Sequence, residues 1–314
     1  MTVVTFASLK GAPGVTTLAC LVGATWPGER RVMVAECDPS GGDLAARFGL
    51  SSKRGWPTWA TAVRRSGTSA GIEPHLQQLP GGLDVLVGPG GSNVFDSIHA
   101  TDELLANISN EPGGVGVVLA DVGRLPQGDL GSSGWLARSD AVVIVLRGDV
   151  TSVLHVRNRA RDIQAVCGDG VALAVVGTTG YRNEEIAQFT GISVIGNLPF
   201  DPETAAVATG AQGSERRLAR SLLIHSALRL AESLCGDALD PVRAGDPMPV
   251  ASSVERTQPA NPSSLAVRPG SSLRRCLGSL RLLRSQPGVA QRVPALEQHP
   301  EDEGNPERQR EVSA

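Results

Sequence analysis

The chain has 314 residues, of which 41% are hydrophobic and 19% are charged. This length and apolar content can form a large core, which excludes a wholly disordered chain and a small domain that needs disulfides or metals to fold. Lys and Arg number 29 against 32 Asp and Glu, and the formal net charge of -3 excludes a generally polybasic nucleic-acid binder. Only Lys10 and Lys53 are lysines, so a lysine is an unusual residue in this chain.

The five cysteines lie far apart and form no CxxC or Cys/His spacing: Cys20, Cys37, Cys167, Cys235 and Cys276. This pattern predicts small core residues in a reducing compartment, rather than a disulfide framework or a zinc site. The first residues lack the basic and apolar regions of a signal peptide, and no run of about 18 apolar residues occurs. We therefore expect a cytoplasmic protein.

Up to about residue 237, short β-rich apolar runs alternate with helix-like segments, the pattern of a parallel sheet with crossover helices. Several runs are continuous Val, Ile, Leu and Ala, which is typical of strands buried on both faces. The predicted strands cover 2–7, 31–36, 83–87, 115–120, 141–146, 171–176 and 192–196, and the predicted helices cover 16–24, 101–108, 150–166, 183–189 and 214–234. The sequence thus predicts one doubly wound α/β domain over residues 1–237, with a mainly parallel sheet.

Beyond about residue 240 Pro, Ser, Arg and Glu dominate, so residues 238–314 are predicted to be a disordered tail. Near 271–285, four leucines repeat at helical spacing among arginines. Two interpretations stand: a short basic amphipathic helix for an anionic lipid surface or an acidic partner, or an incidental Leu/Arg tract.

The strongest motif follows the first predicted strand. Residues 10–17, Lys-Gly-Ala-Pro-Gly-Val-Thr-Thr, form a small-residue loop between that strand and the first predicted helix. Backbone N–H groups of such a loop and the positive end of the helix dipole cradle a phosphate group. Thr16 stands where a P-loop supplies a hydroxyl to Mg²⁺, whereas Val15 replaces the lysine of the usual G-x-x-x-x-G-K-[ST] pattern.

Lys10 at the start of this loop completes the pattern K-G-[GA]-x-G-x-[TS]-[TS], which resembles the deviant Walker A motif of the ParA/MinD family. The resemblance continues in order along the chain. Residues 36–43 are similar to the switch I segment, residues 119–123 to the Walker B and switch II segment, and residues 139–145 to the strand that follows. Residues 196–201 are similar to the segment that lines the adenine. The resemblance implies P-loop NTPase topology of the ParA/MinD type over roughly residues 1–235.

The resemblance also implies a role for each matching residue. Lys10 would contact nucleotide phosphate, typically across a dimer interface, and Asp38 would orient the attacking water. Thr16 would bind Mg²⁺, which Asp121 would hold through a water molecule. The implied ATP-binding residues are Lys10, Gly11, Ala12, Pro13, Gly14, Val15, Thr16 and Thr17 at the phosphates and Pro199 and Asp201 at the adenine. Gly177-Thr178-Thr179 stands where the family normally has an Asn that reads the base.

The implied function is an ATP-dependent dimeric switch that positions chromosomes, plasmids, division proteins or envelope machinery. Its implied partners are Mg-ATP, a second copy of the chain, a non-specific DNA or membrane surface and a further protein. Its implied location is the cytoplasm, at the nucleoid or the inner membrane face. Val15 leaves open whether ATP is hydrolysed slowly, is bound without hydrolysis, or is not bound at all.

Two other functions remain as alternatives. One is a catalytically degenerate scaffold similar to the CpaE/TadZ branch, which localises pilus or secretion machinery. The other is a metabolic P-loop enzyme such as an ATP-dependent ligase, for which the sequence indicates no substrate pocket. Just beyond the switch I segment, Trp56 and Trp59 are expected to pack in the core, with a dimer face as the alternative.

Overall fold

The computed structural model describes residues 1–11, 13–66, 71–88, 105–106, 108, 114–126, 128, 130, 134–211, 218 and 220–236. Ala12, most of the helix predicted over 101–108 and the whole predicted tail, with its Leu/Arg tract, lie outside these residues. The domain boundary near residue 237 therefore stays a prediction.

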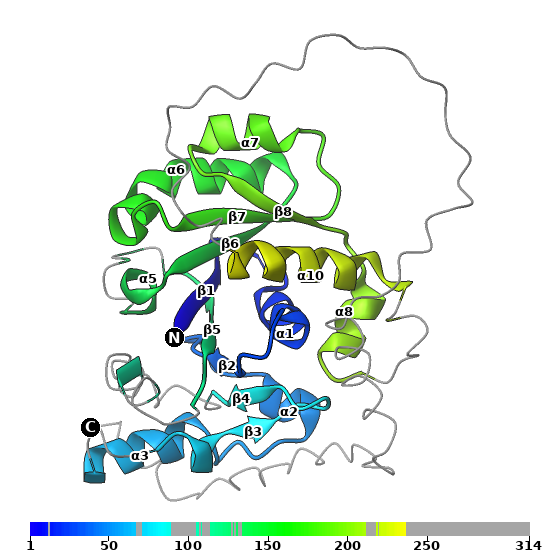
Figure 1. Ribbon diagram of the computed structural model, residues 1–314. Coiled ribbons are helices and arrows are strands. Elements are labelled where there is room, and N and C mark those ends of the chain that lie inside the picture. The colour runs from blue at the N-terminus through cyan, green and yellow to red at the C-terminus, as the bar shows by residue number, and fades with distance from the viewer. Residues whose placement is uncertain are drawn as a thin grey trace, which may run out of the picture. The chain divides into compact units, whose positions relative to one another are not determined.

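The described strands form one sheet, in the order β3-β4-β2-β5-β1-β6-β7-β8 (Figure 1). Every neighbouring pair is parallel except β3 and β4. The strands are β1 Thr2–Ser8, β2 Val32–Glu36, β3 Gln77–Gln78, β4 Asp84–Leu86, β5 Val117–Arg124, β6 Ala141–Arg147, β7 Val171–Val176 and β8 Val194–Leu198. The predicted doubly wound, mainly parallel sheet is confirmed.

Helices cover both faces of the sheet, as Figure 1 shows. One face packs against α1 Val15–Thr25, α2 Leu44–Phe48, α8 Pro202–Ala208 and α10 Leu222–Cys235. The other packs against α3 Trp56–Ser66, α5 Gly134–Arg138, α6 Val150–Cys167 and α7 Asn183–Thr190. A short 3-10 helix, η2, spans Glu73–His75. No helix in the described part of the chain is long and apolar enough to cross a membrane.

Strand alternation divides the core into two layers. Val4 and Phe6 of β1 pack with the α1 and α10 layer, whereas Val3 and Ala7 pack with the α6 layer. All four side chains are buried, since a parallel sheet with helices on both faces leaves no wet side. This accounts for the continuous apolar runs in the sequence.

Three predicted boundaries differ from the structure. The helix predicted over 214–234 is interrupted at Ser221: Leu218 and Arg220 are helical, and α10 begins at Leu222, where the Ser221 hydroxyl accepts a hydrogen bond from the Leu223 N–H at 3.1 Å and caps the helix. Strand β5 runs on to Arg124, and β8 lies two residues later than expected. Strand β3 was not predicted, because two glutamines at a sheet edge carry no apolar pattern.

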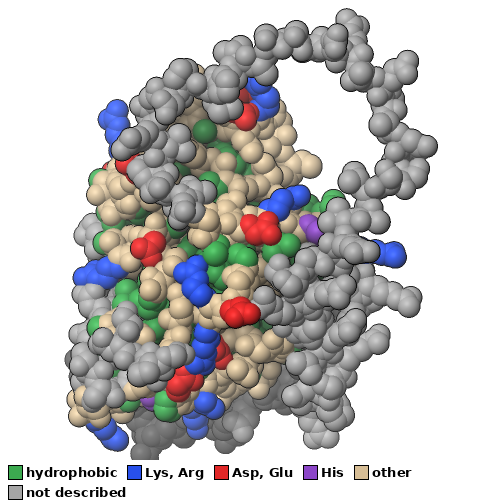
Figure 2. All heavy atoms as spheres, in the orientation of Figure 1, with side chains coloured by type: hydrophobic (Ala, Val, Ile, Leu, Met, Phe, Trp, Pro, Cys, Tyr) green, Lys and Arg blue, Asp and Glu red, His purple; other side chains and the backbone are tan. Residues whose placement is uncertain are grey.

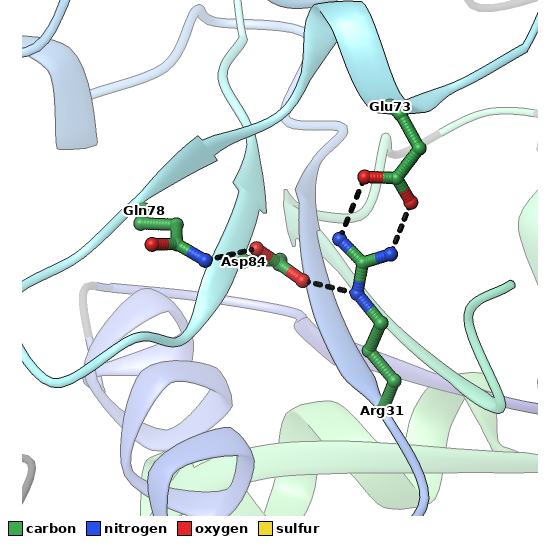
Figure 3. A network of polar contacts seen from close by, with 4 residues as sticks. All are labelled: Arg31, Glu73, Gln78 and Asp84. Atoms are coloured by element: carbon green, nitrogen blue, oxygen red, sulfur yellow. Dashed lines mark hydrogen bonds and ion pairs between the residues drawn. The ribbon is translucent and has the colours of Figure 1, made fainter. Parts of the chain in front are cut away.

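Arg31 connects the start of β2 to the edge of the sheet (Figure 3). Its guanidinium donates to both carboxylate oxygens of Glu73 and, through Nε, to Asp84 at 2.6 Å. The Gln78 amide donates to the other Asp84 oxygen at 3.1 Å. The hydrogen bond to Glu73 is the main cause of the raised pKa of Arg31. The network fastens η2 and the β3–β4 hairpin to β2.

Charged side chains are mixed on the surface drawn in Figure 2. Lys and Arg are interspersed with Asp and Glu on the described part of that face, and no large area of one sign is present there. A mixed surface of this kind agrees with the near-neutral composition of the whole chain.

Three tryptophans form the centre of one core layer. Trp56 makes edge-to-face contacts with Trp59 at 5.5 Å and with Trp135 at 6.3 Å between ring centroids. All three are buried, and none of their indole N–H groups has a hydrogen-bond partner among the described residues. The expected core packing of Trp56 and Trp59 is confirmed. The contacts join α3, which follows the switch I segment, to α5, which follows the switch II segment.

We expect Trp56→Ala to lower the free energy of unfolding by about 3–5 kcal/mol, because it opens a cavity beneath both aromatic partners. Chemical denaturation of the full chain measures this change. Leu222→Ala is the control, since Leu222 is 69% exposed and its loss should change the free energy by less than about 0.5 kcal/mol. Equal effects of the two substitutions would contradict a structural role for the tryptophan cluster.

Candidate nucleotide-binding site

The loop between β1 and α1 has the backbone of a phosphate cradle. Gly11 and Gly14 adopt positive φ angles of 74° and 98°. These angles favour glycine, because glycine has no Cβ atom that would clash with the backbone. Gly14 is the N-cap residue of α1 and no side chain caps that end, so the first amide groups of the helix are left for a ligand. Lys10 and Gly11 are exposed at the start of the loop.

Val15 does not point at this cradle as the missing lysine would. Its side chain is only 6% exposed and packs in the core layer of α1 and α10 with Leu18 and Ala19. The position therefore contributes apolar packing and no charge. The predicted departure from the standard P-loop is a core residue in this structure.

Thr16 and Asp121 meet beside the loop. The Thr16 hydroxyl hydrogen-bonds the Asp121 carboxylate, which also accepts from the Gly123 N–H at 3.0 Å. Asp121 is 2% exposed, and burial raises its pKa to about 7 against the opposing effect of these two hydrogen bonds. Burial disfavours the negative charge of this carboxylate, and a bound cation would compensate that charge. The arrangement therefore fits a cation site. The residues predicted to hold Mg²⁺ are thus brought together.

Asp38, two residues beyond the end of β2, lies against the same segment. A Cβ atom built on Gly123 would fall 1.7 Å from the Asp38 Oδ2 atom, so only glycine leaves room for this carboxylate. Gly123 also has a positive φ of 60°. The other Asp38 oxygen accepts the Ser40 N–H at 2.7 Å, which orients the carboxylate within its loop. The predicted water-orienting residue therefore lies beside the predicted magnesium site.

Glu36 fixes the loop that carries Asp38, a role that the sequence analysis missed. Its side chain accepts the N–H groups of Asp43 and Leu44 at 2.8 and 2.9 Å through one oxygen, and that of Gly88 at 2.9 Å through the other. Glu36 is 3% exposed, and burial raises its pKa although the three N–H groups oppose the shift. An acidic residue that ends an apolar strand was the only signal in the sequence.

Arg159 of α6 is a second residue that the sequence analysis did not place here. Its guanidinium donates to the carbonyl oxygens of Pro126 at 2.6 Å and Gly128 at 3.4 Å. Both carbonyls follow Gly123 in the chain, so Arg159 holds the segment that leaves the site.

A cavity of about 300 Å³ opens on the other side of the loop. It is lined by the predicted residues Pro13, Gly14, Thr17, Pro199 and Asp201, together with apolar side chains of α1, α8 and α10. Its volume and apolar lining are those of a small-ligand site. The phosphate loop and the segment predicted to line the adenine therefore face one cavity.

Asp201 lines this cavity but is occupied as the N-cap of α8. Its carboxylate accepts the N–H of Thr204 at 3.0 Å, contacts the Thr204 hydroxyl at 2.5 Å and accepts the Ser221 hydroxyl at 3.2 Å. The residue therefore shapes the cavity wall and connects α8 to the start of α10.

We expect Glu36→Gln to lower the free energy of unfolding by about 1–3 kcal/mol, because an amide group would face N–H groups that now donate to a carboxylate. Denaturant unfolding measures the loss. Glu29→Gln, a change at an exposed residue, is the matched control and should leave stability within about 0.5 kcal/mol. If both variants are as stable as the parent, Glu36 does not hold the switch I loop.

We expect Gly123→Ala to displace Asp38 and to cost at least about 1–3 kcal/mol, because the new Cβ meets a carboxylate at a positive φ. Thermal or chemical unfolding measures the cost. Gly128→Ala in the same segment is the control, since its Cβ would enter open space. A Gly123→Ala variant as stable as Gly128→Ala would contradict the close approach of Asp38.

Solved structures of ParA and MinD proteins share the observed architecture. A ParA family ATPase from Chlorobium tepidum superposes with a TM-score of 0.57 at 16% identity, covering 74% of this chain and 97% of that one. MinD from Pyrococcus horikoshii, complexed with Mg-ADP, gives 0.56 at 13% identity, with 76% and 97% covered. A putative plasmid partition protein from Borrelia burgdorferi bound to AMPPNP gives 0.52 at 12% identity, with 74% and 96% covered.

The amino-acid sequence matches no protein-family model, and no curated protein matches it at a significant level. The likeness therefore lies in the fold, since the sequence identities are low. The sequence resemblance to the ParA/MinD family is confirmed at that level: the chain has the fold of the ParA/MinD ATPases.

Proposed function

We propose that the protein is a nucleotide-dependent switch that binds Mg-ATP and dimerises around it. The observation that carries the proposal is the convergence of Thr16, Asp121 and Asp38 beside a glycine-rich loop at the N-terminus of α1. Similar folds with bound Mg-ADP and AMPPNP support a nucleotide as the ligand. Spatial positioning of DNA or of division or envelope machinery, in the cytoplasm and at its surfaces, is the cellular role that we propose with it.

The residues of the site divide the work by their positions. Backbone N–H groups of residues 14–17 and the dipole of α1 would bind phosphate oxygens, and Thr16 and Asp121 would hold Mg²⁺. When bound, Mg²⁺ neutralises phosphate charge. Asp38 would orient a water molecule, because its carboxylate lies against Gly123, two residues beyond Asp121.

Lys10 would act between two copies of the chain. It is exposed at the rim of the loop, and an ammonium group there can reach phosphate oxygens that face a second protomer. A compact ammonium suits this approach better than the planar fork of arginine, which is the usual basic residue of this chain.

The buried side chain of Val15 favours a second candidate function, a scaffold without useful hydrolysis. A P-loop lysine offsets charge on the β- and γ-phosphates, and a valine packed in the core cannot do so. Such a scaffold, of the CpaE/TadZ type, would localise pilus or secretion machinery and would keep the fold without turnover.

Nucleotide binding, dimerisation and phosphate release, measured together on the full chain with Mg-ATP, test the proposal. We expect Mg-ATP to convert monomer to dimer, and Lys10→Ala to weaken this dimerisation by about tenfold or more through loss of a charge-assisted hydrogen bond. Asp38→Ala should abolish any phosphate release and leave binding in place.

Lys53→Ala is the matched control, because Lys53 is the other lysine of the chain, is exposed and is not part of residues 10–17. A protein that stays monomeric in millimolar Mg-ATP contradicts the switch. Binding and dimerisation without phosphate release would select the scaffold.

A further inference from the structure

The floor of the cavity is formed by three strand ends in register. Arg147 pairs with Val176 across β6 and β7, and Val176 pairs with Leu198 across β7 and β8. Arg147 shares its face of β6 with Val143 and Val145, which pack in the α1 and α10 layer. Its side chain therefore leaves the sheet on the side of the phosphate loop, and it lines the cavity.

Arg147 contacts an aromatic ring, and its charge also helps to lower the pKa of the nearby Asp149. Its Cζ atom lies 5.6 Å from the centroid of the Phe200 ring, a cation–π contact at the mouth of the cavity. Among the described residues, its guanidinium makes no hydrogen bond and no ion pair. The neighbouring Asp149 carboxylate accepts the Ser152 N–H at 2.8 Å and its hydroxyl at 3.0 Å, as the cap of α6. The guanidinium keeps donors for a ligand.

Hydrogen-bond acceptors are scarce around this cation. The only carboxylate in the described lining belongs to Asp201, which is engaged with Thr204 and Ser221. No Asn or Gln side chain is among the described lining residues, and the second charged donor is Arg47. Arg47 is paired with Asp43 at 2.8 Å. The charged side chains that line this part of the cavity and remain available to a ligand are therefore mainly hydrogen-bond donors.

A cavity of this kind discriminates between the two purines by their edges. Guanine presents two acceptors, O6 and N7, which an arginine fork can bind together, whereas adenine presents an amino donor beside N7. A guanidinium has no acceptor for that amino group. An amide side chain, with one donor and one acceptor, matches adenine instead.

We propose that Arg147 reads the nucleobase, and that the cavity accepts guanine nucleotides at least as tightly as adenine nucleotides. Phe200 fixes the guanidinium at the cavity mouth, and the purine lies against the ends of β7 and β8. The inference rests on the proposed function, because it needs a nucleotide in this cavity, and it names the base that the same site accepts.

Isothermal titration of the full chain with AMPPNP and GMPPNP in Mg²⁺ tests it. We expect the dissociation constant for GMPPNP to equal or fall below that for AMPPNP. Arg147→Gln should shift the ratio toward AMPPNP by about tenfold, the effect of exchanging one bidentate base contact. Arg147→Lys keeps the charge but loses the fork, so it should weaken GMPPNP more than AMPPNP.

Arg157→Gln is the matched control, since Arg157 is also an arginine over a phenylalanine, 6.0 Å from the Phe189 ring centroid, and lies outside the cavity lining. It should leave both constants unchanged. A tenfold preference of the parent for AMPPNP, or a measurable ratio that Arg147→Gln leaves unchanged, overturns the inference alone. Failure of the parent to bind either nucleotide overturns the proposed function and the inference with it.

Discussion

The buried carboxylate of Glu36 organises the centre of this molecule. Three backbone N–H groups from two separate segments donate to it, two from the start of α2 and one from the end of β4. Glu36 directly precedes the loop from Cys37 to Asp43, and its side chain binds the far end of that loop, so one residue fixes both ends. Asp38, near the start of that loop, is thereby placed against Gly123.

The arrangement brings several carboxylates together in the protein interior, away from solvent. Glu36 and Asp121 come from two adjacent strands and are almost fully buried, and Asp38 lies in the loop that follows β2. Burial and these carboxylates raise the pKa values of Cys20 and Cys37, which lie under the site. An uncompensated cluster of this kind is costly, so a cation that arrives with phosphate would lower its free energy. The magnesium nucleotide of the proposed function would supply such a cation.

The sequence predicts most of the sheet because a buried strand has a local signature. Strands β1, β6 and β7 are continuous apolar runs and lie within a residue of where those runs predict them. The site is predictable only where the chain itself carries the motif, as in residues 10–17. Glu36 and Arg159 were missed because their partners are backbone groups up to 52 residues away, which no side-chain pattern reveals. The break at Ser221 within the helix predicted over 214–234 was not foreseen, since it depends on a single hydroxyl that caps α10 and not on the apolar periodicity.

Other positively charged side chains lie near the site although the P-loop lysine is absent. In a standard P-loop, one cation in the first turn of α1 serves the phosphates, and here that position is apolar core. The positive groups are instead elsewhere: Lys10 at the start of the loop, Arg47 in the last turn of α2 and Arg147 at the end of β6. Arg47 is paired with Asp43 and Arg147 lies over the Phe200 ring, and none of the three occupies the first turn of α1, from which a P-loop lysine reaches the γ-phosphate. In the proposed function, such a site would favour nucleotide binding over fast phosphoryl transfer, because transfer depends on charge that is fixed in place before the reaction.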